Sequence, residues 1–146
     1  MFNQAFGMTI TRIALGIILF AHGYILKVET FTIGGTVGFF ESIGLPAIAA
    51  YLVITGEILG GIALILGAFT RLAAWLSLPI LIGATWMHLG NSWVFSAEGG
   101  GWEFPLLLVA LTLSVGFGGA GKYAIDNLDW MTQWSFSRES DLEPTA

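Results

Sequence analysis

The chain has 146 residues, of which 55% are hydrophobic and only 10% are charged, whereas soluble domains carry roughly 25% charged residues. The net charge of −5 argues against nucleic acid as a partner. Because the chain has no cysteine, it can form no disulfide, thiolate metal site or dithiol redox centre of its own. A mean hydropathy of +0.81 therefore indicates a single membrane domain, with the lipid bilayer as its first partner.

The first apolar segment runs from about Met8 to Leu26. No basic region precedes it and no small-residue cleavage site follows it, so we predict a membrane-spanning helix and not a signal peptide. Residues 27–44 are expected to form a loop. Helical spacing inside this loop predicts a short amphipathic helix in or near the membrane interface. The residues that follow this spacing are Thr36, Val37, Phe39, Phe40 and Ile43.

The second predicted span, Ala47–Leu66, is the most continuous apolar stretch of the chain and is long enough to cross a bilayer as one helix. Its middle carries one carboxylate, Glu57, which at that depth needs pairing, hydration or protonation. One face of this helix carries mostly small residues, which let a neighbouring helix approach closely in lipid. That face consists of Ala49, Val53, Gly56, Gly60, Ala63 and Gly67.

Two further spans are expected in the second half of the chain. The third runs from about Leu72 to His88 and contains Pro79, which membrane helices tolerate with a kink. A polar, glycine-rich loop over 90–101 leads to the fourth span, which runs from about Trp102 to Phe117. The chain is therefore predicted to be an all-α, antiparallel four-helix bundle over residues 1–126, followed by a polar, partly interfacial tail over 127–146.

Basic residues predict the orientation of this bundle. Arg12, Arg71, Lys122 and Arg138 fall on the side of the two termini, and only Lys27 falls on the other side. Loops rich in lysine and arginine stay in the cytoplasm, so both termini are predicted to be cytoplasmic. In a bacterium the protein would lie in the inner membrane.

Several stretches, in order along the chain, resemble the DoxX family of small membrane proteins. They are RIALGIILFAHGYILK from Arg12, GFFESIGLP from Gly38, GEILGGIALILGAFTR ending at Arg71, the late His88, GGWEFPLLL from Gly100, and GAGKYAID ending at Asp126. The resemblance covers nearly all of the chain up to about Asn127. It implies a four-helix membrane protein, in some members associated with oxidation of sulfur compounds or thiol stress and with electrons passing to quinone. Ala120 and Lys122 depart from the family pattern, where a proline and an arginine are expected.

Five ionisable residues lie in or at the edges of the spans. Arg12 and Glu57 are predicted to form an internal ion pair, because an arginine side chain can lean into the bundle toward a carboxylate. The alternative is that the pair only neutralises the first two helices and has no further function. His22, His88 and Glu103 come from three different predicted helices and are expected together in the outer third of the membrane.

These outer residues could act as a proton relay, as partners of quinone oxygens or as metal ligands. No two of them share an i, i+3 or i, i+4 spacing, so we predict no metal site. Plain interfacial placement is the alternative for His88 and Glu103. We assign His22, His88, Glu103 and Glu57 as candidate catalytic residues. Cofactor contacts are assigned to Trp102, Tyr24 and Phe40.

The resemblance and these residues predict a small membrane subunit that interacts with quinone or quinol. The sequence has no haem, flavin or nucleotide motif, so electrons would come from a protein partner or from a soluble donor. The chain would then be a subunit of a quinone-linked oxidoreductase. Two alternatives stay open: a non-catalytic membrane anchor or assembly subunit, in a complex or as a homo-oligomer, and a small proton-coupled transporter that uses Glu57.

Overall fold

The protein was examined as a computed structural model that describes residues 3–128, and within this range the chain forms helices and no strand. The all-α prediction is therefore confirmed, and a helix lies inside the first predicted loop. The predicted tail, apart from its first two residues, lies outside the described range. The elements are α1 (Gln4–Phe20), the π-helix η1 (Ala21–Thr30), α2 (Thr32–Ser42), α3 (Ala47–Leu66), α4 (Thr70–His88), α5 (Glu103–Gly118) and the 3-10 helix η2 (Ile125–Asn127).

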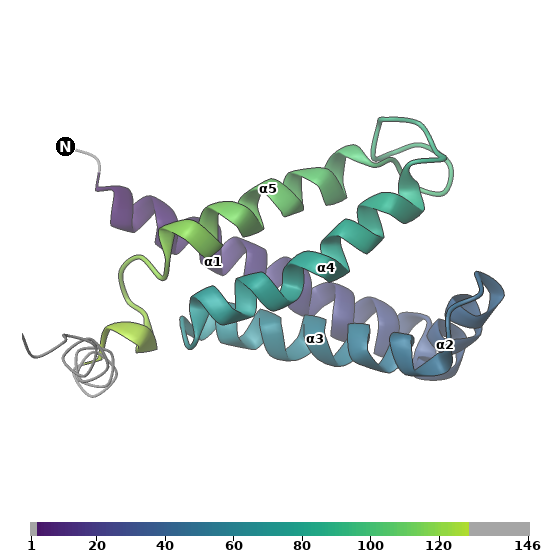
Figure 1. Cartoon of the computed structure of the whole chain (residues 1–146), viewed down its shortest axis with the longest axis horizontal. Coiled ribbons are helices and arrows are strands. Elements are labelled where there is room, and N and C mark those ends of the chain that lie inside the picture. The colour runs from purple at the N-terminus through teal and green to yellow at the C-terminus, as the bar shows by residue number, and fades with distance from the viewer. Residues whose placement is uncertain (1–2, 129–146) are drawn as a thin grey trace, which may run out of the picture.

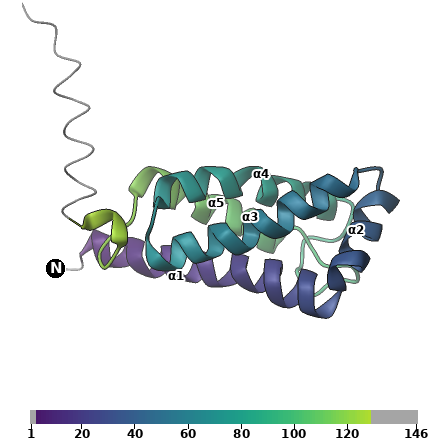
Figure 2. The ribbon, with the colours of Figure 1, turned by 90° about the horizontal axis from the view of Figure 1, so that it is seen from below.

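The long helices are arranged as two packed pairs. The first helix packs along α3, α4 packs along α5, and contacts between α3 and α4 and between α1 and α5 join the pairs. Figures 1 and 2 show that the described N-terminus and η2 lie at one end of the molecule, which we call the terminal end. The short helix α2 and the loop between α4 and α5 lie at the opposite end, the loop end.

The first helix is longer than predicted. It continues without interruption from α1 into η1 and ends at Thr30, so Lys27 is helical and does not lie in a loop. The N–H of Phe31 donates to the carbonyl of Leu26 over 2.8 Å, an i→i+5 bond of the kind that defines a π-helix. The sequence prediction ended the helix at Leu26, where the apolar run ends. In the structure the helix continues, and the side chain of Lys27 binds Glu57 inside the bundle.

Glycines set a close contact between α1 and α3. A Cβ atom built on Gly61 would lie 2.7 Å from the backbone nitrogen of Phe20 and 2.8 Å from the backbone oxygen of Gly16. Seven residues after Gly16, a Cβ on Gly23 in η1 would lie 2.8 Å from the Cβ of Glu57. Gly16 and Gly23 therefore let the first helix approach α3 closely, as small residues do in membrane helix pairs.

The small-residue face predicted for α3 packs against a different helix. A Cβ on Gly56 would meet the side chain of Ile80 at 2.7 Å, and one on Gly60 would meet Ser77 Oγ at 2.9 Å. Both of these neighbours belong to α4. Helix α3 thus presents Gly56 and Gly60 to α4 and Gly61 to α1, so it packs closely on two sides.

Arg12 closes the terminal end. Its side chain is fully buried and donates to the carbonyl groups of Leu64 and Ile65 at the end of α3. The same guanidinium donates to carbonyls of the segment that follows α5. These acceptors are Ala120 at 2.9 Å, Lys122 at 3.4 Å and Tyr123 at 3.2 Å. Carbonyls at a helix end have no partner within the helix, so one arginine satisfies groups from two distant parts of the chain.

Asp126 fastens the same segment to the next helix. Its carboxylate accepts the backbone N–H of Phe69 at 2.6 Å and that of Thr70 at 2.8 Å, at the start of α4. A carboxylate is stabilised at a helix N-terminus, where free N–H groups and the helix dipole favour negative charge. The GAGKYAID stretch therefore contacts three helices: Asp126 caps the start of α4, and backbone carbonyls of the stretch bind Arg12 of α1, which also binds the end of α3.

The outer surface is strongly apolar. The segments Gln4–Thr30 and Ala47–Leu66 are long and apolar enough to cross a membrane, and Glu103–Gly118 is apolar but shorter. Large hydrophobic side chains point outward from every long helix, for example Ile17, Leu52, Leu76 and Phe117, which are 54%, 65%, 64% and 72% exposed. A soluble protein rarely exposes so much contiguous apolar surface, whereas lipid covers it in a membrane.

The contact between α1 and α3 gives a direct test with a matched control. We expect Gly61→Ala to lower the free energy of unfolding by about 1–3 kcal/mol, because the new methyl group meets backbone atoms that cannot move aside. Gly83→Ala in α4 has no atom within 4 Å of its new Cβ, and we expect it to be neutral or stabilising by up to about 1 kcal/mol. Detergent-induced unfolding followed by tryptophan fluorescence measures both. Equal effects would contradict the close contact.

Candidate functional site

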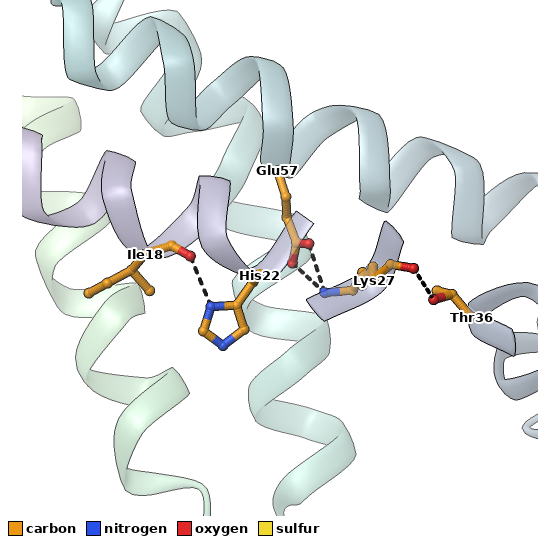
Figure 3. Close-up of polar contacts among 5 residues, drawn as sticks. All are labelled: Ile18, His22, Lys27, Thr36 and Glu57. Carbon is orange, nitrogen blue, oxygen red and sulfur yellow. Dashed lines mark hydrogen bonds and ion pairs between the residues drawn. The ribbon is translucent and has the colours of Figure 1, made fainter. Parts of the chain in front are cut away.

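A buried ion pair lies between η1 and α3. The amine of Lys27 donates to both carboxylate oxygens of Glu57, at 2.9 Å to Oε1 and 2.7 Å to Oε2. Figure 3 shows the two side chains meeting between the two ribbons. The Glu57 side chain is 7% exposed and that of Lys27 19%, so the pair is largely removed from solvent. Two opposite charges at this depth satisfy each other and remove the cost of an isolated ion in lipid.

The predicted pairing of Glu57 with Arg12 is wrong. Close contacts place Gly23 against Glu57 and place Arg12 against Gly67, ten residues further along α3. Ten residues of helix span about 15 Å, which an arginine side chain cannot cover. Lys27 lies four residues after Gly23, and its long side chain reaches the carboxylate instead.

Lys27 and its neighbours were missed by the sequence analysis. The hydroxyl of Thr36 in α2 donates to the backbone carbonyl of Lys27 over 3.0 Å, as Figure 3 also shows. This bond ties the short helix α2 to the π-helix that carries the ion pair. The sequence feature that could have identified this partner of Glu57 is that Lys27 is the only lysine or arginine between Arg12 and Arg71.

His22 lies beside the ion pair on the same helical segment. Its Nδ1 is 2.9 Å from the carbonyl oxygen of Ile18, and because a carbonyl only accepts, Nδ1 carries the proton and donates. Figure 3 shows the ring turned away from Glu57. The ring instead stacks near Phe104 of α5, with 6.4 Å between ring centroids. Within residues 3–128 no hydrogen bond uses Nε2, so the neutral ring presents that nitrogen as an acceptor.

His88 has the same arrangement at the end of α4. Its Nδ1 donates to the carbonyl of Ala84 over 2.7 Å, which again leaves Nε2 as the acceptor of the neutral ring. The ring packs against the loop, because a Cβ on Gly100 would lie 3.3 Å from Nε2. His88 therefore contacts the loop that follows its own helix.

Glu103 and Trp102 also hold this loop. The carboxylate of Glu103 accepts the backbone N–H of Phe95 over 2.9 Å. The ring of Trp102 meets that of Trp93 edge to face, with 4.3 Å between centroids. Within the described residues no hydrogen bond joins His22, His88 and Glu103 to one another. The same part of the chain contains no group of three histidine or acidic residues that could hold a metal ion.

The two other predicted cofactor contacts have aromatic neighbours of their own. Tyr24 is 42% exposed and stacks on Phe20, with 5.6 Å between ring centroids. Phe40 meets Phe39 edge to face at 6.0 Å. Among residues 3–128 no ring stacking or hydrogen bond joins either of them to His22.

The cavities of the described residues lie elsewhere. An apolar groove of about 280 Å³ runs between α4 and α5, and its lining includes Trp86, Leu89 and Leu106. A larger cleft lies at the terminal end. The predicted pocket lined by His22, Glu57, His88, Trp102 and Glu103 coincides with neither of them. The candidate site is therefore η1 together with Glu57 of α3. This segment carries Lys27 of the buried ion pair and His22, whose Nε2 has no hydrogen bond within residues 3–128.

The ion pair predicts a specific pattern of rescue. Glu57→Leu alone should lower the free energy of unfolding by about 3–5 kcal/mol, because it leaves the Lys27 ammonium buried without a partner. Lys27→Met combined with Glu57→Leu should recover most of that loss. Arg12→Leu combined with Glu57→Leu should instead show additive losses, because Arg12 binds carbonyls and not Glu57. Rescue by the Arg12 substitution in detergent-unfolding measurements would contradict this assignment.

Two comparisons with known proteins bear on this geometry. The DoxX family model matches residues 7–90, which include η1, Lys27 and Glu57. A protein of Bacillus subtilis (strain 168) named "Putative oxidoreductase CatD" is 34% identical over 116 residues, covering 77% of this chain and 82% of the relative. No solved structure matches the chain. Together with the apolar helices this identifies an integral membrane protein, and the chain belongs to the DoxX family.

Proposed function

We propose that this protein is a membrane subunit of a redox system that supplies protons to a quinone reduced by a partner protein. The observation that carries the proposal is the buried ion pair between Lys27, on a π-helical segment, and Glu57 of α3, together with His22 on the same segment, whose Nε2 has no hydrogen bond within residues 3–128. Ionisable groups inside a membrane segment are costly and are usually retained for a function. π-Helical turns also occur frequently at functional sites.

The family and the relative's name support the redox part of the proposal. The relative is named a putative oxidoreductase, and the DoxX family model matches the residues that contain the ion pair and His22. The chain has no cysteine to carry electrons, so a partner would oxidise a sulfur compound or a thiol and pass two electrons to the quinone. Two protons must arrive with the two electrons to form the quinol.

His22 would deliver one of these protons. Its Nδ1–H is held by the Ile18 carbonyl, so only Nε2 can exchange a proton. When Nε2 is protonated, it can donate that proton to a quinone oxygen, and the ring must then be protonated again before the next turnover. Lys27, which lies on the same segment as His22, and the Glu57 carboxylate that it contacts from α3 would form the inner end of this proton path.

Two substitutions at His22 separate its two nitrogens. Asparagine keeps a donor near the position of Nδ1, whereas glutamine places a polar group near the position of Nε2. Quinone binding, read as quenching of the tryptophan fluorescence, should weaken about tenfold in His22→Asn and stay within a few-fold in His22→Gln. Quinol formation in native membranes should fall in both variants, since neither amide transfers protons at neutral pH.

Thermal stability serves as the control for this experiment. Both variants should unfold within a few degrees of the wild type, because the ring is only half-buried and makes one hydrogen bond. Full quinol formation in His22→Asn would exclude the proposed role of Nε2.

A second candidate function is a membrane anchor or assembly subunit. It is favoured by one observation: His88, Glu103 and Trp102 all fasten the loop between α4 and α5 and line neither described cavity. If purified protein binds no quinone, while a partner still co-purifies with every His22 variant, the anchor function replaces the redox-coupled one.

The proposed topology has four membrane spans with both termini in the cytoplasm. The basic residues Arg71 and Lys122 are exposed at the terminal end, and Lys27 at the other end is neutralised by Glu57. Reporter fusions after Gly67 and after Ala146 should therefore report the cytoplasm, and a fusion after Ala97 should report the opposite side. A periplasmic signal from the Ala146 fusion would contradict this topology.

A further inference from the structure

A large cleft at the terminal end is separate from the candidate functional site. It encloses about 940 Å³ and is walled by the start of α1, the start of α4, the end of α5 and the segment that leads to η2. Its wall combines apolar side chains, such as Met8 and Leu72, with polar ones, such as Gln4 and Asn127. A cleft of this mixed character suits a ligand that has both a polar and an apolar part.

Arg71 supplies the positive charge of the cleft. Its side chain is exposed and lies over the glycine turn after α5, because a Cβ on Gly119 would be 3.3 Å from Arg71 Nε. Within residues 3–128 Arg71 forms no ion pair. A guanidinium without a carboxylate partner can bind a phosphate group with two parallel hydrogen bonds.

Thr70 provides a second, independent observation. The residue forms part of the cleft wall and is fully buried, and its hydroxyl has no hydrogen-bond partner among the described residues. Buried hydroxyl groups are nearly always paired, since leaving one unpaired costs free energy. A ligand oxygen in the cleft would give this hydroxyl its missing partner.

Asp126 also lines the cleft, but its charge is already engaged. Both of its carboxylate oxygens accept backbone N–H groups at the start of α4, at Phe69 and Thr70. The positive end of the helix dipole offsets this negative charge further. The free charge in the wall is therefore that of Arg71.

We propose that this cleft binds a phosphate group, held by Arg71 and by the hydroxyl of Thr70. The source favoured by the structure is the headgroup of an anionic phospholipid. The cleft is walled by the ends of apolar helices, where lipid headgroups meet a membrane protein. Leu72 in its wall and Phe117, next to the lining residue Gly118, are exposed apolar side chains. Free phosphate has the same recognition chemistry and differs only in lacking acyl chains.

The test uses the purified full chain in detergent after lipid removal. Phosphatidylglycerol should bind in native mass spectra and raise the unfolding temperature, whereas diacylglycerol with the same acyl chains should do neither. Inorganic phosphate distinguishes the two sources: a lipid site should respond to it much more weakly than to phosphatidylglycerol, and an equal response would assign the site to free phosphate.

Three substitutions locate the site. Arg71→Gln should weaken phosphatidylglycerol binding by about tenfold, which corresponds to loss of a charge-assisted contact. Thr70→Val should also weaken binding, by several-fold, yet leave the lipid-free protein at least as stable as the wild type, because its hydroxyl has no partner to lose. Lys122→Gln is the matched control, since Lys122 is exposed nearby but does not line the cleft.

Two results would overturn the proposal. Equal losses in Arg71→Gln and Lys122→Gln would show only general attraction between charge and lipid. Binding of diacylglycerol as tight as that of phosphatidylglycerol would show that no phosphate group is recognised. Because Arg71 is exposed and Thr70→Val preserves side-chain shape, both variants are expected to fold, so neither result depends on loss of structure.

Discussion

The structure depends on the buried guanidinium of Arg12. In lipid every backbone polar group needs a partner within the protein, and the carbonyls at the end of α3 and in the segment after α5 have none of their own. Arg12 supplies donors to five of them and so holds three separate parts of the chain at the terminal end. Its position also sets the register of α1 against α3, and this register brings Gly23 opposite Glu57.

The ion pair of Lys27 and Glu57 follows from that register. Because Gly23 has no side chain, η1 lies close enough to α3 for the next turn to carry Lys27 to the carboxylate. Thr36 then attaches α2 to the same turn. The buried ion pair thus joins one short π-helical segment to the helix it faces, and His22 lies on that segment with its ring stacked near Phe104 of α5.

The two ends of the molecule use polar residues differently. At the terminal end Arg12 and Asp126 bind backbone groups and fasten helix ends together, and the cleft beside them carries an arginine without an ion-pair partner within residues 3–128. At the loop end His88, Glu103 and Trp102 fasten a loop. The DoxX family match over residues 7–90 includes both kinds of residue. Arg12 and the glycines between the first helix and α3 hold the helices together, and Lys27 and Glu57 form the buried ion pair.

The sequence by itself determined the helices, because each is encoded by a local run of apolar residues with recognisable ends. The predicted second span, Ala47–Leu66, agrees with α3 at both ends, and the predicted fourth span differs from α5 by one residue at each end. Spacing also identified the helix inside the first loop, although not its bounds. The partner of Glu57 was decided only by the tertiary structure, because it depends on how far α1 slides along α3. Arg12 and Lys27 both lie on the helix that packs against α3. The local sequence pattern does not encode the register in which Lys27 contacts the carboxylate and Arg12 contacts backbone carbonyls. The protonated nitrogen of His22 and the loop bond of Glu103 were decided in the same way, by neighbours that come into contact only when the chain is folded.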